Sequence, residues 1–111
     1  LDEVHEMRKA FDARRRAIVA ALNDIEGVNC PTPTGAFYVF ADITALLGKP
    51  LGPKGTVSDT SADFAAALLE EAHVAAVPGE AFGAPGYLRF SYALADEDLA
   101  EGMRRFKEWA N

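Results

Sequence analysis

Apolar side chains recur at three- and four-residue steps over residues 4–25, which places them on one face of a helix. We expect this long amphipathic helix to end near Gly27, because glycine enters the left-handed conformation without steric cost. Residues 31–35, rich in proline, then exclude helix and indicate an extended connector. The apolar face of the helix comprises Val4, Met7, Phe11, Ile18, Leu22 and Ile25.

Three later segments have the pattern of strands. Residues 36–40 are aromatic and β-branched and predict a largely buried strand. Residues 74–77 predict a short strand that ends at the following Pro-Gly pair, and residues 87–92 alternate in polarity as a strand does. Residues 46–58 contain several glycines and prolines, so we expect a long, mobile loop there.

Two more helices complete the predicted fold. One begins near residues 59–61, where several side chains can cap it, and runs to about Ala72. The last has acidic residues at its start and basic residues at its end, which complements the helix dipole over residues 96–107. The order helix, strand, helix, two strands, helix predicts a single α+β domain over residues 1–111, with helices covering one small mixed sheet.

Composition narrows the possible functions. The chain has 111 residues, of which 50% are hydrophobic and 25% charged, as expected for one globular domain. Its net charge is −6, and the excess of acid lies within residues 56–111. This charge argues against a nucleic-acid binder, and no apolar run is long enough to predict a membrane span. The chain begins at Leu1 without a signal-peptide pattern, and we expect it to be either a processed chain or a piece of something longer.

Little in the sequence indicates a metal-binding site or a reactive thiol. His5 and His73 are far apart, Cys30 is alone, and no spacing resembles a zinc site. We interpret His73 as a helix-terminal or surface residue and Cys30 as a small, partly buried apolar residue. Since one cysteine forms no internal disulfide, nothing requires an oxidising compartment, and a cytoplasmic location is expected.

Most basic residues have an ordinary interpretation. The loop over residues 48–55 lacks the spacing of a phosphate-binding loop, and its prolines remove backbone donors. The run Arg14-Arg15-Arg16 cannot form one flat patch, because consecutive helical residues point in different directions. It indicates a solvated face or a source of ion pairs, with contact to another domain as the alternative.

Arg89 differs from the other basic residues. Strand alternation places Arg89 in the middle of the last predicted strand, on the face opposite Leu88 and Phe90. A guanidinium held there offers a planar fork suited to two-point binding of a carboxylate. The alternative, an ordinary solvent-facing strand residue, is the more common situation for arginine.

Three segments in order resemble one enzyme family: residues 35–40 (GAFYVF), 74–83 (VAAVPGEAFG) and 86–93 (GYLRFSYA). Together with the first and last helices, they resemble the C-terminal small domain of class I pyridoxal-phosphate aminotransferases, and within these the bacterial aspartate aminotransferases. The resemblance covers nearly the whole chain. It implies a parent enzyme that moves an amino group between an amino acid and a 2-oxo acid, and that is a homodimer.

The resemblance assigns roles to two residues. It implies that Arg89 binds the substrate α-carboxylate and that Phe37 lies in the pocket wall, although Phe37 also fits a core strand aromatic. Gly79, Gly83 and Gly86 are expected to shape turns. The lysine that forms a Schiff base with pyridoxal phosphate, and the other cofactor-binding groups, belong to the family's large domain, so we expect this chain alone to be inactive.

Two alternatives remain open at this stage. The parent could be an alanine, aromatic or methionine aminotransferase, because side-chain selectivity lies mostly outside this segment. The chain could also be a stand-alone, non-catalytic α+β binding module. That alternative predicts no large exposed apolar patch, whereas a small domain without its large domain should expose one.

Overall fold

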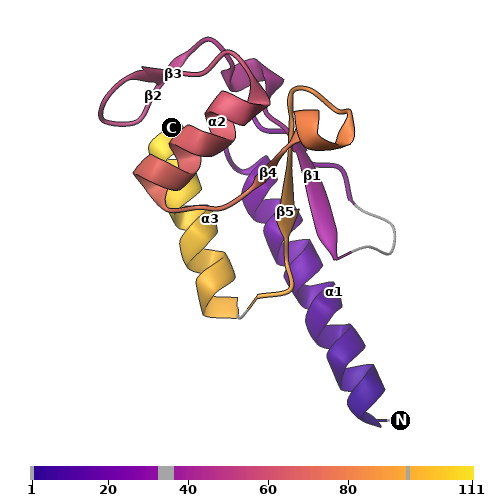
Figure 1. Ribbon diagram of the computed structural model, residues 1–111. Coiled ribbons are helices and arrows are strands. Elements are labelled where there is room, and N and C mark those ends of the chain that lie inside the picture. The colour runs from indigo at the N-terminus through magenta and orange to yellow at the C-terminus, as the bar shows by residue number, and fades with distance from the viewer. Residues whose placement is uncertain (1, 33–36, 95) are drawn as a thin grey trace.

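The computed structural model describes residues 2–32, 37–94 and 96–111 (Figure 1). Its long helices are α1 (Asp2–Asn23), α2 (Ser61–Ala67) and α3 (Asp96–Ala110), and α2 continues into a π-helical turn, η2 (Leu68–Ala72). The strands are β1 (Tyr38–Asp42), β2 (Pro50–Leu51), β3 (Thr56–Val57), β4 (Val77–Pro78) and β5 (Tyr87–Ser91). Two short 3-10 helices are η1 (Thr44–Leu46) and η3 (Gly79–Phe82). No helix in these described ranges is long and apolar enough to cross a membrane.

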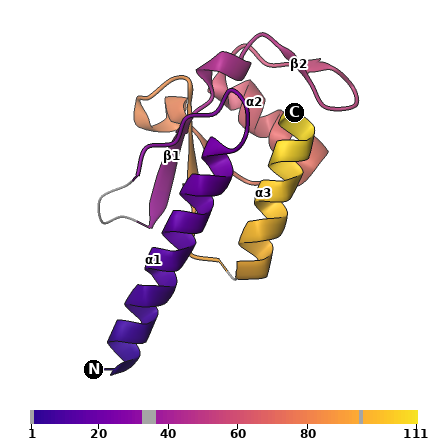
Figure 2. The ribbon, with the colours of Figure 1, turned by 180° about the vertical axis from the view of Figure 1, so that it is seen from behind.

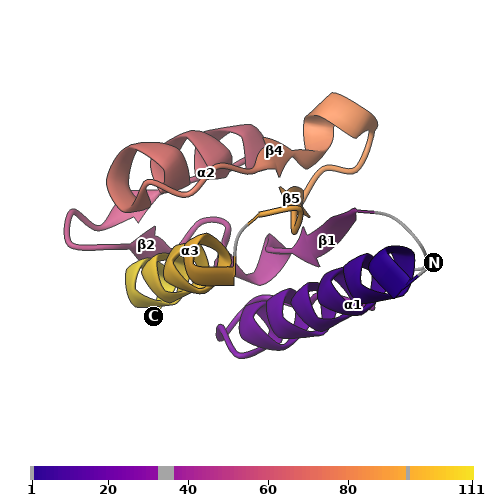
Figure 3. The same cartoon turned by 90° about the horizontal axis from the view of Figure 1, so that it is seen from below.

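The predicted α+β fold is confirmed, and β5 is its central strand. The main sheet has the order β1-β5-β4, with Phe40 opposite Arg89 on one side and Val77 opposite Arg89 on the other. We expected a mixed sheet, but every strand pair in the described part of the chain is antiparallel. Seen from below, β4 lies nearest α2 and β1 nearest α1, with β5 between them (Figure 3).

The core forms where the helices meet one face of the main sheet. Val39 and Leu88 are fully buried on that face, and Phe64 of α2 contacts Phe106 and Trp109 of α3 edge-on. α1 and α3 lie side by side, as the front and back views show (Figures 1 and 2). The apolar faces of the helices pack together because burying these side chains removes apolar surface from water.

The first helix is buried along only part of its length. Ile18 and Leu22 are almost completely buried, whereas Val4 and Met7 are 56% and 60% exposed. The N-terminal half of α1 projects beyond the rest of the molecule in Figure 1. α1 ends at Asn23, before the expected stop near Gly27, although Gly27 does adopt a positive φ of 92°. The Asn23 side chain donates to and accepts from the backbone of Cys30 and so holds the turn that follows the helix.

The predicted caps of the second helix are confirmed. The Thr60 hydroxyl accepts a hydrogen bond from the backbone N–H of Asp63, which satisfies one of the free donors of the first turn. The helix ends at His73, which is exposed and adopts the left-handed conformation at φ 58°. His73 is therefore a helix-terminal surface residue, as expected.

Residues 46–58 do not form the irregular loop that we expected. They begin at Leu46, the last residue of η1, and contain the hairpin β2–β3, whose Leu51 is buried. The hairpin is held from outside: the Gly52 N–H donates to the carbonyl of Trp109, and the Thr56 hydroxyl donates to Glu71. Two-residue strands are too short to show a periodic pattern in the sequence, so the conformation of this segment depends on tertiary contacts.

Two strand predictions need their bounds corrected. Residues 74–77 were expected to form a strand, but β4 covers only Val77–Pro78, because Val74 still donates a helix-closing hydrogen bond to Leu68. Pro78 is tolerated since β4 is an edge strand. The strand expected over residues 36–40 is β1, Tyr38–Asp42; Ala36 lies outside the described residues.

Candidate functional site

The candidate site is the sheet face that points away from the helices. Along β5, Leu88 and Phe90 are buried, whereas Tyr87 and Arg89 are half-buried and Ser91 is exposed, so the predicted alternation is confirmed. The antiparallel register places Phe40 directly across from Arg89. Arg89 therefore stands at the centre of the sheet, on the face that the helices leave open.

Two aromatic rings contact the Arg89 guanidinium. Its Cζ atom lies 4.3 Å from the centre of the Tyr38 ring and 5.7 Å from that of Phe82. The rings of Phe40 and Phe82 meet edge-on, with centroids 5.3 Å apart. Tyr38 and Phe40 are about two-fifths exposed, at 40% and 39%. Sequence reasoning singled out Arg89 but missed these three rings, although alternation around the buried Val39 would have pointed to Tyr38 and Phe40.

Arg89 carries an uncompensated charge within the described residues. Its Nε atom is buried without a hydrogen-bond acceptor, and no carboxylate within the described ranges forms an ion pair with it. The two other half-buried arginines in these ranges, Arg14 and Arg15, pair with Asp96 and Asp12. Because removing an unpaired charge from water is costly, Arg89 is suited to receive an anion, and its planar fork matches a carboxylate.

The structure does not bring Phe37 together with Arg89. Phe37 packs edge-on against Phe11 of α1, with ring centroids 5.1 Å apart, and its carbonyl accepts from the N–H of Tyr92. At 56% exposure it is not a core aromatic, which overturns that alternative. Phe37 instead joins Val4, Met7 and Phe11 in an exposed apolar surface beside the projecting half of α1.

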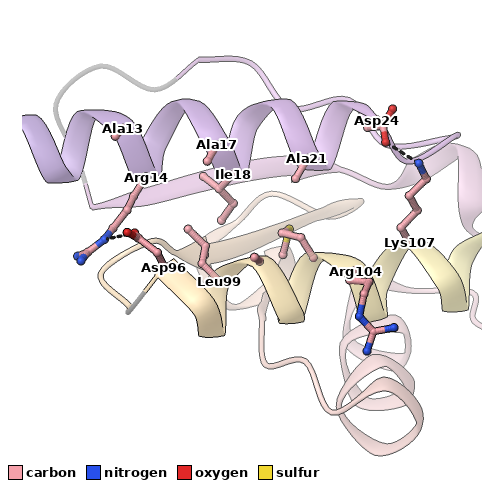
Figure 4. Close-up of a pocket in the computed structure, with 12 residues that line it drawn as sticks. Ala13, Arg14, Ala17, Ile18, Ala21, Asp24, Asp96, Leu99, Arg104 and Lys107 are labelled. Carbon is pink, nitrogen blue, oxygen red and sulfur yellow. Dashed lines mark hydrogen bonds and ion pairs between the residues drawn. The ribbon is translucent and has the colours of Figure 1, made fainter.

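A groove lies between α1 and α3, and Arg89 is not among the residues that line it (Figure 4). This groove of about 580 Å³ is lined mainly by small and apolar side chains, among them Ala17 and Leu99. An ion pair closes each end: Arg14 with Asp96 at 2.9 Å, and Lys107 with Asp24 at 2.5 Å. The expectation that the arginine run supplies ion pairs is thus confirmed for Arg14.

The other sequence candidates lie apart from this face. In the described part of the chain, no group of three or more histidines, cysteines and acidic residues could hold a metal ion. Cys30 is buried more completely than expected, and burial raises the pKa of its thiol to about 11. Gly83 and Gly86 have positive φ angles of 75° and 89°, so they shape turns as predicted.

Comparisons with known proteins support the family resemblance found in three segments of the sequence. A family model described as "Aminotransferase class I and II" matches residues 1–106. The chain belongs to this aminotransferase family. The "Aspartate aminotransferase" of Streptomyces avermitilis is 56% identical to it over 108 residues, which are 97% of this chain and 26% of that protein. The "Probable aspartate/prephenate aminotransferase" of Aquifex aeolicus is 50% identical over 107 residues, 96% of this chain and 25% of that protein.

Solved structures show the same fold. The crystal structure of an aspartate aminotransferase from Rhizobium meliloti matches this aminotransferase chain with a TM-score of 0.91 and 42% identity, over 98% of this chain and 27% of that one. An aromatic aminotransferase from Pyrococcus horikoshii matches with a TM-score of 0.80 and 41% identity, over 96% of this chain and 26% of that one. The chain thus spans about a quarter of the length of the relatives it matches.

Proposed function

We propose that residues 1–111 form the small domain of a longer, pyridoxal-phosphate-dependent aspartate aminotransferase, and that Arg89 binds the α-carboxylate of its substrate. The reaction would move an amino group between an amino acid and a 2-oxo acid. Relatives named aspartate aminotransferase, up to 56% identical, support the choice of aspartate. A cytoplasmic location and a homodimeric parent stay predictions.

One observation in the fold carries the proposal. Arg89 is a half-buried guanidinium without an anionic partner in the described residues, fixed on the central strand of the sheet and open to one side. A carboxylate that binds the guanidinium fork would neutralise this charge. The uncompensated cation thus fits the α-carboxylate common to all amino-acid and 2-oxo-acid substrates.

The residues of this chain do not fit the cofactor itself. Pyridoxal phosphate needs a lysine to hold its aldehyde carbon, and the lysines here lie elsewhere. Lys9 and Lys107 are ion-paired with Glu6 and Asp24, and Lys49 and Lys54 are exposed in and near the β2–β3 hairpin. We therefore assign the cofactor to the remaining part of the longer protein, and this chain contributes substrate binding.

The decisive experiment uses the longer protein that carries this chain, loaded with pyridoxal phosphate. We expect Arg89→Leu to lower kcat/KM for L-aspartate with 2-oxoglutarate by about 10- to 100-fold, because a hydrogen bond to a charged group contributes about 1.5–3 kcal/mol. Cofactor absorbance should be unchanged. Arg16→Leu, at an exposed position of α1, is the matched control and should keep wild-type kinetics. Equal kinetics for Arg89→Leu and wild type would reject the assignment.

Substrate profiling separates the rival functions. If activity on L-alanine or on aromatic amino acids exceeds that on L-aspartate, the longer protein is an alanine or aromatic aminotransferase instead. The absence of transfer to any 2-oxo acid would favour a non-catalytic binding module. The exposed apolar surface around Val4, Met7 and Phe37 argues against that module, since a stand-alone domain would be expected to bury it.

A further inference from the structure

We infer that Tyr38 and Phe82 are positioning residues, which hold the Arg89 guanidinium in the orientation that receives a carboxylate. This inference rests on the proposed function, because it assumes that Arg89 binds substrate. Neither Tyr38 nor Phe82 is among the site residues predicted from the sequence. Its basis is that two rings from separate elements contact one unpaired cation.

The strand register puts Tyr38 within reach of Arg89. Tyr38 of β1 is paired with Ser91, so it is the diagonal neighbour of Arg89, a position from which long and aromatic side chains can touch. The guanidinium carbon lies 4.3 Å from the centre of the Tyr38 ring, well inside the range for attraction between a cation and an aromatic face. Tyr38 therefore contacts the guanidinium from the neighbouring strand.

Phe82 approaches the same group from η3. Its ring centre lies 5.7 Å from the guanidinium carbon, at the outer part of that range. Phe82 is itself held by Phe40, which meets it edge-on and which stands opposite Arg89 in the sheet. The turn at Gly83, with a φ of 75°, ends η3 directly after Phe82. The ring is thus fixed by packing on one side and by the turn on the other.

Ring contacts orient a guanidinium without using its hydrogen-bond donors. A carboxylate partner within the protein would occupy the N–H groups, whereas an aromatic ring attracts the cation and leaves the in-plane donors available to a ligand. This matches Arg89, which forms no ion pair within the described residues. A side chain held in its binding orientation loses less conformational freedom when the ligand arrives. Tyr38 and Phe82 should therefore strengthen carboxylate binding without touching the carboxylate.

The test uses the longer protein loaded with pyridoxal phosphate. We expect Tyr38→Leu to lower kcat/KM for L-aspartate by about 3- to 20-fold through a higher KM, the range that corresponds to one cation–aromatic contact. Tyr38→Phe should keep at least half of the wild-type value, because the ring and not the hydroxyl makes the contact. Phe82→Leu should act in the same direction with a smaller effect, since its ring is farther away. Val57→Ala, at an exposed apolar position of the remote hairpin, is the control.

Two further measurements distinguish positioning from a general structural role. The slow reaction of the bound cofactor with propylamine, which lacks a carboxylate, should be unchanged in Tyr38→Leu. In an Arg89→Leu background, Tyr38→Leu should have no additional effect, because its action passes through Arg89. Equal losses with L-aspartate and propylamine, or additive losses in the double variant, would overturn the inference. If Arg89→Leu alone has no effect, the proposed function fails; if Arg89→Leu impairs the enzyme and Tyr38→Leu does not, only the positioning role fails.

Discussion

The backbone N–H of Gly86 donates a 2.7 Å hydrogen bond to the hydroxyl of Ser61, and both residues are buried. The bond joins the start of α2 to the turn that leads into β5. On the other side of the same turn, the Gly86 carbonyl accepts from the N–H of Ile43. The strand that carries Arg89 is therefore anchored at its beginning by two segments distant in sequence.

Ser61→Ala should destabilise the chain by about 1–3 kcal/mol, because the buried N–H of Gly86 would lose its acceptor. Urea denaturation of the 111-residue chain, followed by circular dichroism, measures this change. Ser91→Ala is the matched control: Ser91 is exposed, and its loss should change the free energy of unfolding by less than about 0.5 kcal/mol. Equal stability of the two variants would show that the Ser61 hydroxyl is dispensable.

Gly79 cannot accept a side chain. A Cβ at this position would lie only 1.7 Å from the carbonyl oxygen of Ala84, so the backbone would have to move. We expect Gly79→Ala to destabilise the chain by about 3 kcal/mol, the upper end for overpacking. A Cβ on Gly102 in α3 would meet open space, and Gly102→Ala should stabilise the chain by about 0.5–1 kcal/mol. Thermal denaturation of both variants should thus shift in opposite directions.

Glu71 should make the attachment of the hairpin sensitive to acid. The hydrogen bond from the Thr56 hydroxyl, at 2.7 Å, is the main cause that lowers the pKa of Glu71, with smaller contributions from Trp109 and Lys54. A carboxyl group whose pKa is lower in the folded state stabilises the fold above its unfolded pKa, and this contribution is lost as the pH falls through its folded pKa. Wild type should therefore lose stability in acid.

Glu71→Gln isolates this contribution. The variant should be less stable than wild type at pH 7, and the difference should shrink as the pH is lowered toward about 3, because wild type then loses the same charge. Trp109 is the sole tryptophan of the chain, so its fluorescence follows unfolding next to the site. Glu70→Gln, at an exposed neighbouring position, serves as the control. A difference between Glu71→Gln and wild type that does not change with pH would contradict the prediction.

Cys30 should react slowly with thiol reagents. Its side chain is 2% exposed, and a pKa of about 11 leaves about one thiol in a thousand ionised at pH 8. Iodoacetamide labelling at pH 8, followed by mass spectrometry, should be at least about 100-fold slower in the folded chain than in urea. Labelling at the same rate in both states would show that Cys30 is accessible.

Local patterns predicted the elements with long repeats. The helical period of residues 4–25, the acidic start of α3 and the alternation in β5 each concern neighbours along the chain, and the structure confirms all three. The hairpin over residues 50–57 was missed because its strands have two residues each and depend on Trp109 and Glu71. The helical period did not place the end of α1 at Asn23, whose side chain bonds to the backbone of Cys30 beyond the helix.

The sequence by itself determined the α+β class, the resemblance to aminotransferases and the face of the strand on which Arg89 lies. Only the tertiary structure decided which side chains surround Arg89: Tyr38 and Phe82 contact it, whereas Phe37 packs against Phe11 of α1. The physical reason is that alternation and helical period follow from backbone geometry within one segment. Contacts between segments depend on strand register and on packing, which join residues far apart along the chain, as Tyr38 and Ser91 are.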